Sequence, residues 1–265
     1  MSELHVEAGG LRVAYRRAGQ GPPLVLLHGI LADSRVWRPQ LDSLPDAFDV
    51  IAWDAPGTGG SGDPGAGFGM EDWADCLAEF LVRLDAAPAH VLGLSWGGVL
   101  AQELYARHPD RVLSLILCDT YAGWKGSLAP ELVAERLAGC EREAGLPPSE
   151  FLPAWLPGLL RREAPPDVRD EMERVMSDFH PAGYLQMGRA VAASDTRELL
   201  PRIAVPTLLL WGEEDARSPL GVARQLEEAI PGAELAVIPD CGHVSNLDQP
   251  ARFDAEVRRF LARVA

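Results

Sequence analysis

The sequence has few of the features that mark secreted, membrane-bound or nucleic-acid-binding chains. Its 265 residues include four cysteines and a single lysine, Lys125, and the formal net charge is −15 at pH 7. No apolar run approaches the roughly 20 residues of a membrane-spanning helix, and the first residues lack the basic and apolar segments of a targeting signal. Nucleic acids and anionic membranes require clustered positive charge. We therefore expect a cytoplasmic protein with no nucleic-acid or membrane partner.

Sequence motifs for cofactors and metals are also missing. The chain has no Gly-x-x-x-x-Gly-Lys-Ser/Thr loop, no Cys-x-x-Cys pair and no His-Glu-x-x-His motif. The glycine-rich run from Gly57 to Gly62 contains no lysine, so we interpret it as a structural turn. The cysteines have no framework spacing, which predicts reduced thiols. We predict no cofactor and no metal, and a hydrophobic content of 47% is enough for a globular core without them.

Short apolar runs alternate with helical segments along most of the chain. The runs are Leu24–Leu27, Val50–Trp53, Ala89–Leu94, Leu113–Cys118, Thr207–Trp211 and Leu235–Ile238. This alternation predicts an α/β fold with a mostly parallel central sheet and helices on both faces. Two more short strands, near Leu4–Glu7 and Arg12–Arg17, are expected to form an antiparallel edge joined at Gly9-Gly10.

The strand pattern stops between Tyr121 and about Asp195, where the segment becomes helical and rich in proline. We predict a helical cap of residues 121–195, inserted into a core domain of residues 1–120 and 196–265. The insertion falls between two parallel strands, so it should cover the crevice at their carboxyl ends.

Residues 93–98 read Gly-Leu-Ser-Trp-Gly-Gly and lie between the run Ala89–Leu94 and a helical pattern that ends at Arg107. This context predicts a tight strand-to-helix turn that presents Ser95 as a nucleophile. Gly93 and Gly97 stand where backbone segments come too close for a Cβ atom. The alternative is a glycine-rich turn whose serine only caps the helix.

A serine hydroxyl is a weak nucleophile, so the hypothesis needs a histidine base and a carboxylate that orients it. His243 lies in a polar loop directly after the run Leu235–Ile238 and is the best candidate among six histidines. His28 follows the run Leu24–Leu27, and we assign it a structural role.

For the acid, Asp215 follows the run Thr207–Trp211, which places it beside the catalytic face. Glu213 and Glu214 are local competitors, and Asp119 follows another apolar run. We prefer Asp215. If Asp215 only caps the helix that starts near Ser218, then Asp119 is the orienting acid.

Together these motifs resemble the α/β-hydrolase superfamily, nearly end to end from the strand before His28 through Phe260. The matching segments are His28-Gly29 with Trp37, Asp54 to Ser61, the Ser95 turn, Gly212 to Asp215, and Gly242-His243 with Asn246 and Pro250. Residues 242–250 look most like small esterases and enol-lactonases, including 3-oxoadipate enol-lactonases. Similar loops occur in C–C bond hydrolases and in relatives of cofactor-free haloperoxidases.

The resemblance implies an α/β-hydrolase fold, the chain order serine, acid, histidine, and an acyl-enzyme at Ser95. An oxyanion hole would use the backbone N–H of Trp96, at a helix N-terminus, and that of Ile30, in the loop after His28-Gly29. Epoxide hydrolases and haloalkane dehalogenases of this fold need an aspartate at the position of Ser95, so both activities are excluded.

The cap segment contains aromatic and apolar side chains that could line a pocket, most of which we assign to its own core. We name Trp124, Trp155 and Met187 as candidate substrate contacts. Four cations could capture a substrate carboxylate, although charges on such helices are usually solvated: Lys125, Arg161, Arg162 and Arg189.

We therefore predict a monomeric or homodimeric serine hydrolase that cleaves a carboxylic ester or lactone of a small to mid-sized, partly hydrophobic molecule. One alternative is a hydrolase that uses the same triad on a C–C bond next to a ketone. The other is a small-molecule receptor on the same fold.

Overall fold

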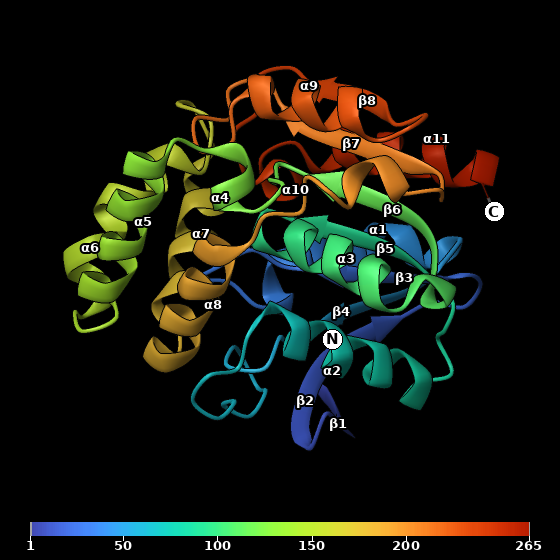
Figure 1. The fold of residues 1–265 in the computed structure, drawn as a ribbon, viewed down its shortest axis with the longest axis horizontal. Helices are drawn as coiled ribbons and strands as arrows, with labels where there is room; N and C mark the ends of the chain where they lie inside the picture. Colours follow the sequence, from blue (N-terminus) through green and yellow to red (C-terminus); the bar gives the residue numbers. More distant parts are fainter. Residues whose placement is uncertain (1, 265) are drawn as a thin grey trace.

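In the computed structural model, which describes residues 2–264, eight strands form one sheet in the order β1-β2-β4-β3-β5-β6-β7-β8. The pairs β1·β2 and β2·β4 are antiparallel, and all other neighbours are parallel (Figure 1). The strands are β1 (Leu4–Ala8), β2 (Leu11–Ala18), β3 (Pro23–Leu27), β4 (Asp49–Trp53), β5 (Ala89–Leu94), β6 (Val112–Cys118), β7 (Thr207–Gly212) and β8 (Glu234–Ile238). The mostly parallel sheet and its antiparallel edge are confirmed.

Burial explains why the central strands are mostly apolar while the edges are mixed. Every residue of β4, β5 and β7 is buried, as expected for parallel strands covered on both faces. The edge strands are more open, and Leu4 in β1 and Val237 in β8 are 41% and 42% exposed.

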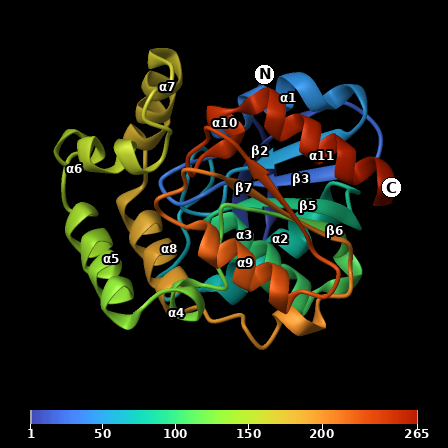
Figure 2. The ribbon, with the colours of Figure 1, turned by 90° about the horizontal axis from the view of Figure 1, so that it is seen from above.

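Helices cover both faces of the sheet. Figure 2 shows α1 and α11 on one side of the sheet and α2, α3 and α9 on the other. The core helices are α1 (Arg38–Ser43), α2 (Met70–Arg83), α3 (Trp96–Arg107), α9 (Leu220–Ala229), α10 (Ser245–Asp248) and α11 (Pro250–Val264). Short 3-10 turns occupy Ser34–Trp37, Leu44–Asp46, Pro109–Arg111, Leu156–Gly158 and Leu200–Arg202.

Five helices between β6 and β7 gather at one side of the molecule (Figures 1 and 2). They are α4 (Trp124–Ser127), α5 (Pro130–Glu143), α6 (Pro148–Trp155), α7 (Pro166–Ser177) and α8 (Pro181–Ala193). We call residues 121–195 the cap segment. Helices α5 to α8 all begin with proline, whose fixed φ suits the first helical position, and this accounts for the proline-rich sequence.

Aromatic rings form the core of the cap segment. The Tyr184 ring lies between 5.6 and 6.5 Å from the rings of Phe151, Trp155 and Phe179, measured between centroids. Most of the aromatic side chains of this segment therefore pack against one another.

The four cysteines are unbridged and buried. Burial raises the pKa of the Cys76 thiol to about 12, so the thiol stays protonated and unreactive near neutral pH. Within residues 2–264, no helix has the length and apolar character needed to cross a membrane.

Candidate active site

Ser95 lies in the turn between β5 and α3, in a backbone conformation that is rare for a residue with a side chain. Its φ is 54° and its ψ is −115°. Two hydrogen bonds from the neighbouring chain hold it there: Ser95 N donates to Cys118 O at 2.9 Å, and Thr120 Oγ1 donates to Ser95 O at 2.5 Å. The structure thus shows the tight turn that the sequence predicts.

The two glycines that flank Ser95 permit this turn because α3 packs very closely on the sheet. A Cβ atom on Gly93 would collide with the carbonyl oxygen of Gly97, and one on Gly97 would collide with the carbonyl oxygen of Leu27. Both obstacles are backbone atoms, which a side-chain rotation cannot move. The requirement for glycine at both positions is therefore steric.

Ser95, His243 and Asp215 form a continuous hydrogen-bonded chain. The Ser95 Oγ lies 2.9 Å from His243 Nε2, and His243 Nδ1 lies 2.8 Å from Asp215 Oδ2. A carboxylate only accepts hydrogen bonds, so this contact places the imidazole proton on Nδ1 and leaves Nε2 to accept the serine proton. All three residues are buried.

The second carboxylate oxygen of Asp215 shapes its own loop. Asp215 Oδ1 accepts hydrogen bonds from the backbone N–H groups of Arg217, at 2.8 Å, and Ser218, at 2.9 Å. Asp215 therefore both holds the turn before α9 and contacts the histidine. Glu213 and Glu214, the nearby competitors, are exposed.

Asp119 directly follows β6 and is not part of the hydrogen-bonded chain of Ser95, His243 and Asp215. Its Oδ1 accepts from Gly212 N at 2.8 Å, and its Oδ2 accepts from Ser245 Oγ at 2.5 Å. Burial raises the pKa of Asp119 well above its ordinary value, and the nearby charge of Asp215 adds to the shift. Asp119 thus links the loop that carries Asp215 to the loop that carries His243.

Two backbone segments lie beside Ser95, the start of α3 and the loop after β3. Trp96 is the first residue of α3, so its N–H has no acceptor within the helix. Gly29 is so close that a Cβ built on it would lie 3.9 Å from Ser95 Oγ, and Ile30, the next residue, lines the same cavity.

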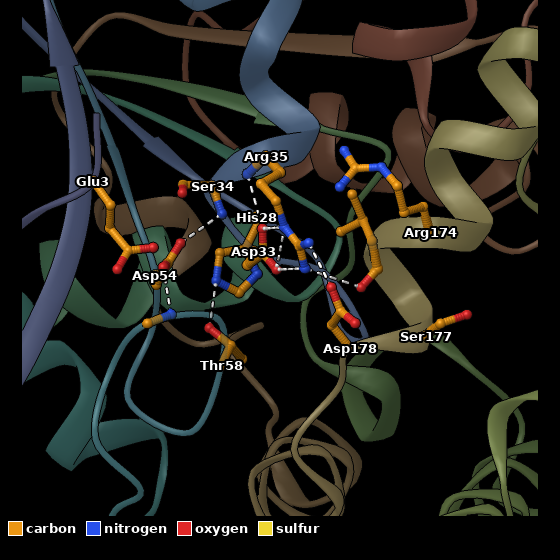
Figure 3. Close-up of polar contacts among 12 residues, drawn as sticks. Glu3, His28, Asp33, Ser34, Arg35, Asp54, Thr58, Arg174, Ser177 and Asp178 are labelled. Atoms are coloured by element: carbon orange, nitrogen blue, oxygen red, sulfur yellow. Dashed lines mark hydrogen bonds and ion pairs between the residues drawn. The ribbon is translucent and has the colours of Figure 1, made fainter. Parts of the chain in front are cut away.

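His28 holds this loop through hydrogen bonds to backbone atoms and lies close to Thr58 (Figure 3). Its Nδ1 lies 2.8 Å from the Gly29 carbonyl oxygen, and its Nε2 accepts a hydrogen bond from Ala55 N at 3.0 Å. Burial lowers the pKa of His28, which keeps the ring neutral, as this pair of contacts requires. The structure thus gives His28 a positioning role.

The next part of the loop is tied to the core and to the cap segment. Asp54 accepts from Ser34 N at 2.7 Å. As Figure 3 shows, the Arg35 guanidinium lies between two carboxylates, with nitrogen-oxygen distances of 2.6 Å to both Asp33 and Asp178. Asp178 directly follows α7, so Arg35 joins the loop after β3 to the cap segment.

A cavity opens at Ser95 and His243 between the core and the cap segment. The other residues that line it are Gly29, Ile30, Ala32, Val36, Leu94, Tyr121, Trp124, Arg136, Trp155, Leu159, Met172, Arg217 and Val244.

Two of the three residues named from sequence as substrate contacts, Trp124 and Trp155, are among them. Met187 is not: it is fully buried beside a separate small cavity next to Leu31, because its face of α8 packs on the core.

The Trp96 side chain also packs inside the protein. Its ring lies edge-to-face with that of Trp73, at 5.2 Å between centroids. The Trp96 ring therefore belongs to the core and is not among the side chains that line the cavity at Ser95.

The cations named from sequence lie elsewhere. Lys125, Arg162 and Arg189 are exposed, and Arg161 pairs with Asp248, with 3.4 Å between Nε and Oδ1. Instead, Arg136 from α5 and Arg217 from the loop after Asp215 reach the cavity wall. The sequence could have indicated Arg217, because it lies two residues after the candidate acid. No neighbouring motif in the sequence indicates Arg136. Over residues 2–264, no group of three or more histidine, cysteine or acidic side chains is placed to hold a metal ion.

Comparison with known proteins agrees with this geometry. The model of the α/β hydrolase fold family matches residues 22–250, which is most of the chain. The chain therefore belongs to the α/β-hydrolase fold family, a family of enzymes.

Individual relatives share both sequence and fold. The pimeloyl-[acyl-carrier protein] methyl ester esterase of Chromobacterium violaceum is 31% identical over 248 residues, which cover 89% of this chain and 92% of the esterase. A thermophilic esterase from Thermogutta terrifontis superposes with a TM-score of 0.92 at 30% identity and covers 100% of this chain and 99% of its own. The enol-lactonase from Burkholderia xenovorans LB400 gives a TM-score of 0.88 at 28% identity, with coverages of 98% and 100%.

Proposed function

We propose that this chain is a serine hydrolase that cleaves a carboxylic ester or lactone through an acyl-enzyme on Ser95. The observation that carries the proposal is the chain of contacts from Ser95 Oγ through His243 to Asp215, which ends in a cavity. Relatives named as esterases and an enol-lactonase support the same class of bond.

The reaction follows from the hydrogen bonds. The Ser95 Oγ attacks the carbonyl carbon while His243 Nε2 takes its proton, and Asp215 stabilises the imidazolium that forms. The tetrahedral intermediate expels the alcohol oxygen, which receives the proton from His243. A water molecule, deprotonated by the same nitrogen, then attacks the acyl-enzyme. The second tetrahedral intermediate expels Ser95 Oγ, which takes the proton back from His243 as the acid leaves. In a lactone, the alcohol stays joined to the acyl group through the carbon chain, so the second step releases a single hydroxy acid.

The oxyanion of each tetrahedral intermediate would be bound by the N–H groups of Trp96 and Ile30. The position of Trp96 at the start of α3 supports this role, because the helix dipole also favours negative charge there. The support for Ile30 is its position in the loop beside Ser95, which His28 holds. A backbone donor works through position, so the side chain of Ile30 is free to contact substrate.

The lining of the cavity indicates a substrate with an apolar portion. Aromatic rings of Trp124 and Trp155 and the side chains of Val36, Leu159 and Met172 surround the route to Ser95. Because Trp155 and Met172 belong to the cap segment, we propose that this segment helps to select the substrate.

A panel of p-nitrophenyl esters and lactones tests the proposal. Wild-type enzyme should turn over members of the panel, and Ser95→Ala should lose at least about 10³-fold in kcat. A matched control is available in Ser114→Ala, because Ser114 Oγ also lies close to a histidine, 2.8 Å from His90 Nδ1, but is fully buried in the sheet. This variant should retain activity.

Other products would identify the alternatives. Cleavage of a C–C bond beside a ketone, with no ester turnover, would assign the triad to the carbon-bond reaction. Stoichiometric ligand binding without turnover would indicate a receptor and overturn the proposal.

A further inference from the structure

We propose that the wall of the Ser95 cavity contains a carboxylate-binding subsite made by Arg217 and Arg136, so that the substrate is an ester or lactone that carries a free carboxylate. This proposal rests on the proposed function and names its substrate class. It also moves the expected carboxylate contact from the four cations suggested by sequence to two others.

Arg217 forms no ion pair with any residue that the structure describes. Its Cζ lies 3.7 Å from the centroid of the Trp155 ring, so the guanidinium is stacked on the cap segment. Within residues 2–264, no carboxylate oxygen lies within 4.0 Å of the Arg217 guanidinium, the limit for an ion pair. Over the same residues, this guanidinium donates no hydrogen bond. Burial lowers the pKa of Arg217, the charge of Arg136 adds to this, and Tyr121, Tyr184 and Asp215 oppose it. Arg217 is half-buried and stacked on Trp155, so its unused donors are free to bind a ligand that supplies the acceptor.

Arg136 brings a second positive charge to the same wall. Its Nη1 donates to Tyr121 Oη at 3.0 Å and its Nη2 donates to the Arg217 carbonyl oxygen at 2.8 Å. Its Cζ also lies 5.5 Å from the Trp124 ring centroid. These neutral partners orient Arg136 and leave its charge uncompensated within the described residues.

Both carboxylate oxygens of Asp215, the acid beside His243, already accept hydrogen bonds. Asp215 uses Oδ2 for His243 and Oδ1 for two backbone N–H groups. Among residues 2–264, the cavity wall therefore has two cations that form no ion pair with a carboxylate. A guanidinium presents its donors as a rigid planar fork that matches a carboxylate, and an enclosed wall of one sign concentrates the opposite charge.

The orientation of Arg217 is fixed in advance. Trp155, on which it stacks, donates from Nε1 to Glu143 Oε2 at 3.0 Å, and Tyr184 Oη donates to the same oxygen at 2.6 Å. A subsite whose parts are held before binding loses less entropy when the ligand arrives. The competing role for Arg217 is purely structural, as a contact that fastens the cap segment to the core.

Paired substrates distinguish a subsite from a fastening contact. For a carboxylate on the acyl side, p-nitrophenyl hydrogen glutarate is compared with p-nitrophenyl valerate, which has the same acyl chain length. For a carboxylate on the alcohol side, 4-(butyryloxy)benzoate is compared with phenyl butyrate. We expect kcat/KM of the wild type to favour the charged member of at least one pair by 10-fold or more, mainly through KM.

Arg217→Met keeps an apolar side chain against Trp155 and removes the charge. This variant should lose the preference, so that kcat/KM for the charged and the neutral ester of a pair agree within about threefold, and Arg217→Lys should keep part of the preference. The matched control is Arg189→Met, in which an exposed arginine of α8 that pairs with Glu141 is replaced; its preference should equal that of the wild type. An equal loss on both esters, or no preference in the wild type, would overturn the proposal.

A binding measurement separates this proposal from the chemistry on Ser95. In Ser95→Ala, glutarate should bind in calorimetry at least 10-fold more tightly than glutaramide, and Arg217→Met in that background should abolish the difference. If the neutral ester is hydrolysed at Ser95 but glutarate shows no such advantage, the subsite is wrong and the serine hydrolase remains. If the advantage is present and no ester or lactone is hydrolysed, the subsite stands and the proposed reaction is wrong.

Discussion

Asp119 and Asp215 follow the neighbouring parallel strands β6 and β7, yet only Asp215 forms a hydrogen bond with His243, with 2.8 Å between Oδ2 and Nδ1. Asp119 binds Gly212 N and Ser245 Oγ instead. The two acids therefore have separable roles, one in orienting the imidazole and one in bracing the loops.

Replacing each acid by asparagine tests this division. Asp215→Asn should lower kcat for an ester by about 10³- to 10⁴-fold, because an amide nitrogen facing Nδ1 favours the wrong tautomer. Asp119→Asn should lower it by less than about 10-fold, since its amide can still accept from Gly212 N and donate to Ser245 Oγ. Steady-state kinetics on one ester decide the matter, and the reverse order of losses would make Asp119 the orienting acid.

The fit of α3 against the sheet predicts a large steric penalty at Gly93. Gly93→Ala should destabilise the protein by at least about 3 kcal/mol, or prevent folding, because the new methyl group meets a backbone carbonyl. Gly139→Ala, in the middle of α5, adds a methyl group whose nearest neighbour is 3.7 Å away and should stabilise by about 0.5–1 kcal/mol. Urea unfolding measures both, and equal effects would contradict the steric account.

Burial of His28 predicts a dependence of stability on pH. Its folded pKa lies below the unfolded value of 6.5, because burial outweighs its bond to Gly29 and the nearby carboxylates of Asp54 and Asp33. Below pH 6.5 the unfolded chain therefore binds a proton that the folded protein does not, and stability falls as the pH falls toward the folded pKa.

His28→Gln removes this contribution. Between pH 6.5 and 5, the slope of unfolding free energy against pH should become flatter than in the wild type by up to about 1.4 kcal/mol per pH unit. The buried His90, whose pKa is also lowered, contributes a separate slope that remains. Denaturant titrations at several pH values give the slopes. An unchanged slope would mean that His28 is protonated equally in both states.

Arg35 forms ion pairs that join the loop after β3 to the cap segment. We therefore expect unequal effects on stability when Arg35 and Arg38 are replaced. Arg35→Met leaves the buried Asp33 without its cation and should cost about 1–3 kcal/mol. Arg38→Met removes a solvent-exposed contact with Asp42 and should cost less than about 0.5 kcal/mol. Chemical unfolding compares the two, and a cost of Arg35→Met no larger than that of Arg38→Met would contradict this account.

The strands and the triad loops were predictable because they depend on local sequence. Buried parallel strands are short apolar runs, so each was found within a residue or two of its ends; β6, for example, begins at Val112 where the apolar run predicted Leu113. The residues after these runs had to lie at one edge of the sheet, which brought Ser95, Asp215 and His243 together.

The cavity wall depends on how the cap segment packs, which local sequence does not determine. Arg217 becomes significant only because Trp155, more than sixty residues earlier, stacks on it. Met187 was expected to contact the substrate and is instead buried beside Leu31. The spacing of apolar residues shows that one face of a helix is buried, but not whether that face packs on the core or lines the cavity.

The most direct test of the central claim is intact mass spectrometry after reaction with a phosphonate that traps serine nucleophiles, followed by peptide mapping. The wild type and Ser114→Ala should each gain one adduct, mapped to Ser95, and Ser95→Ala should gain none and lose ester turnover. An adduct at another residue, or ester turnover that persists in Ser95→Ala, would contradict the assignment of Ser95 as the nucleophile.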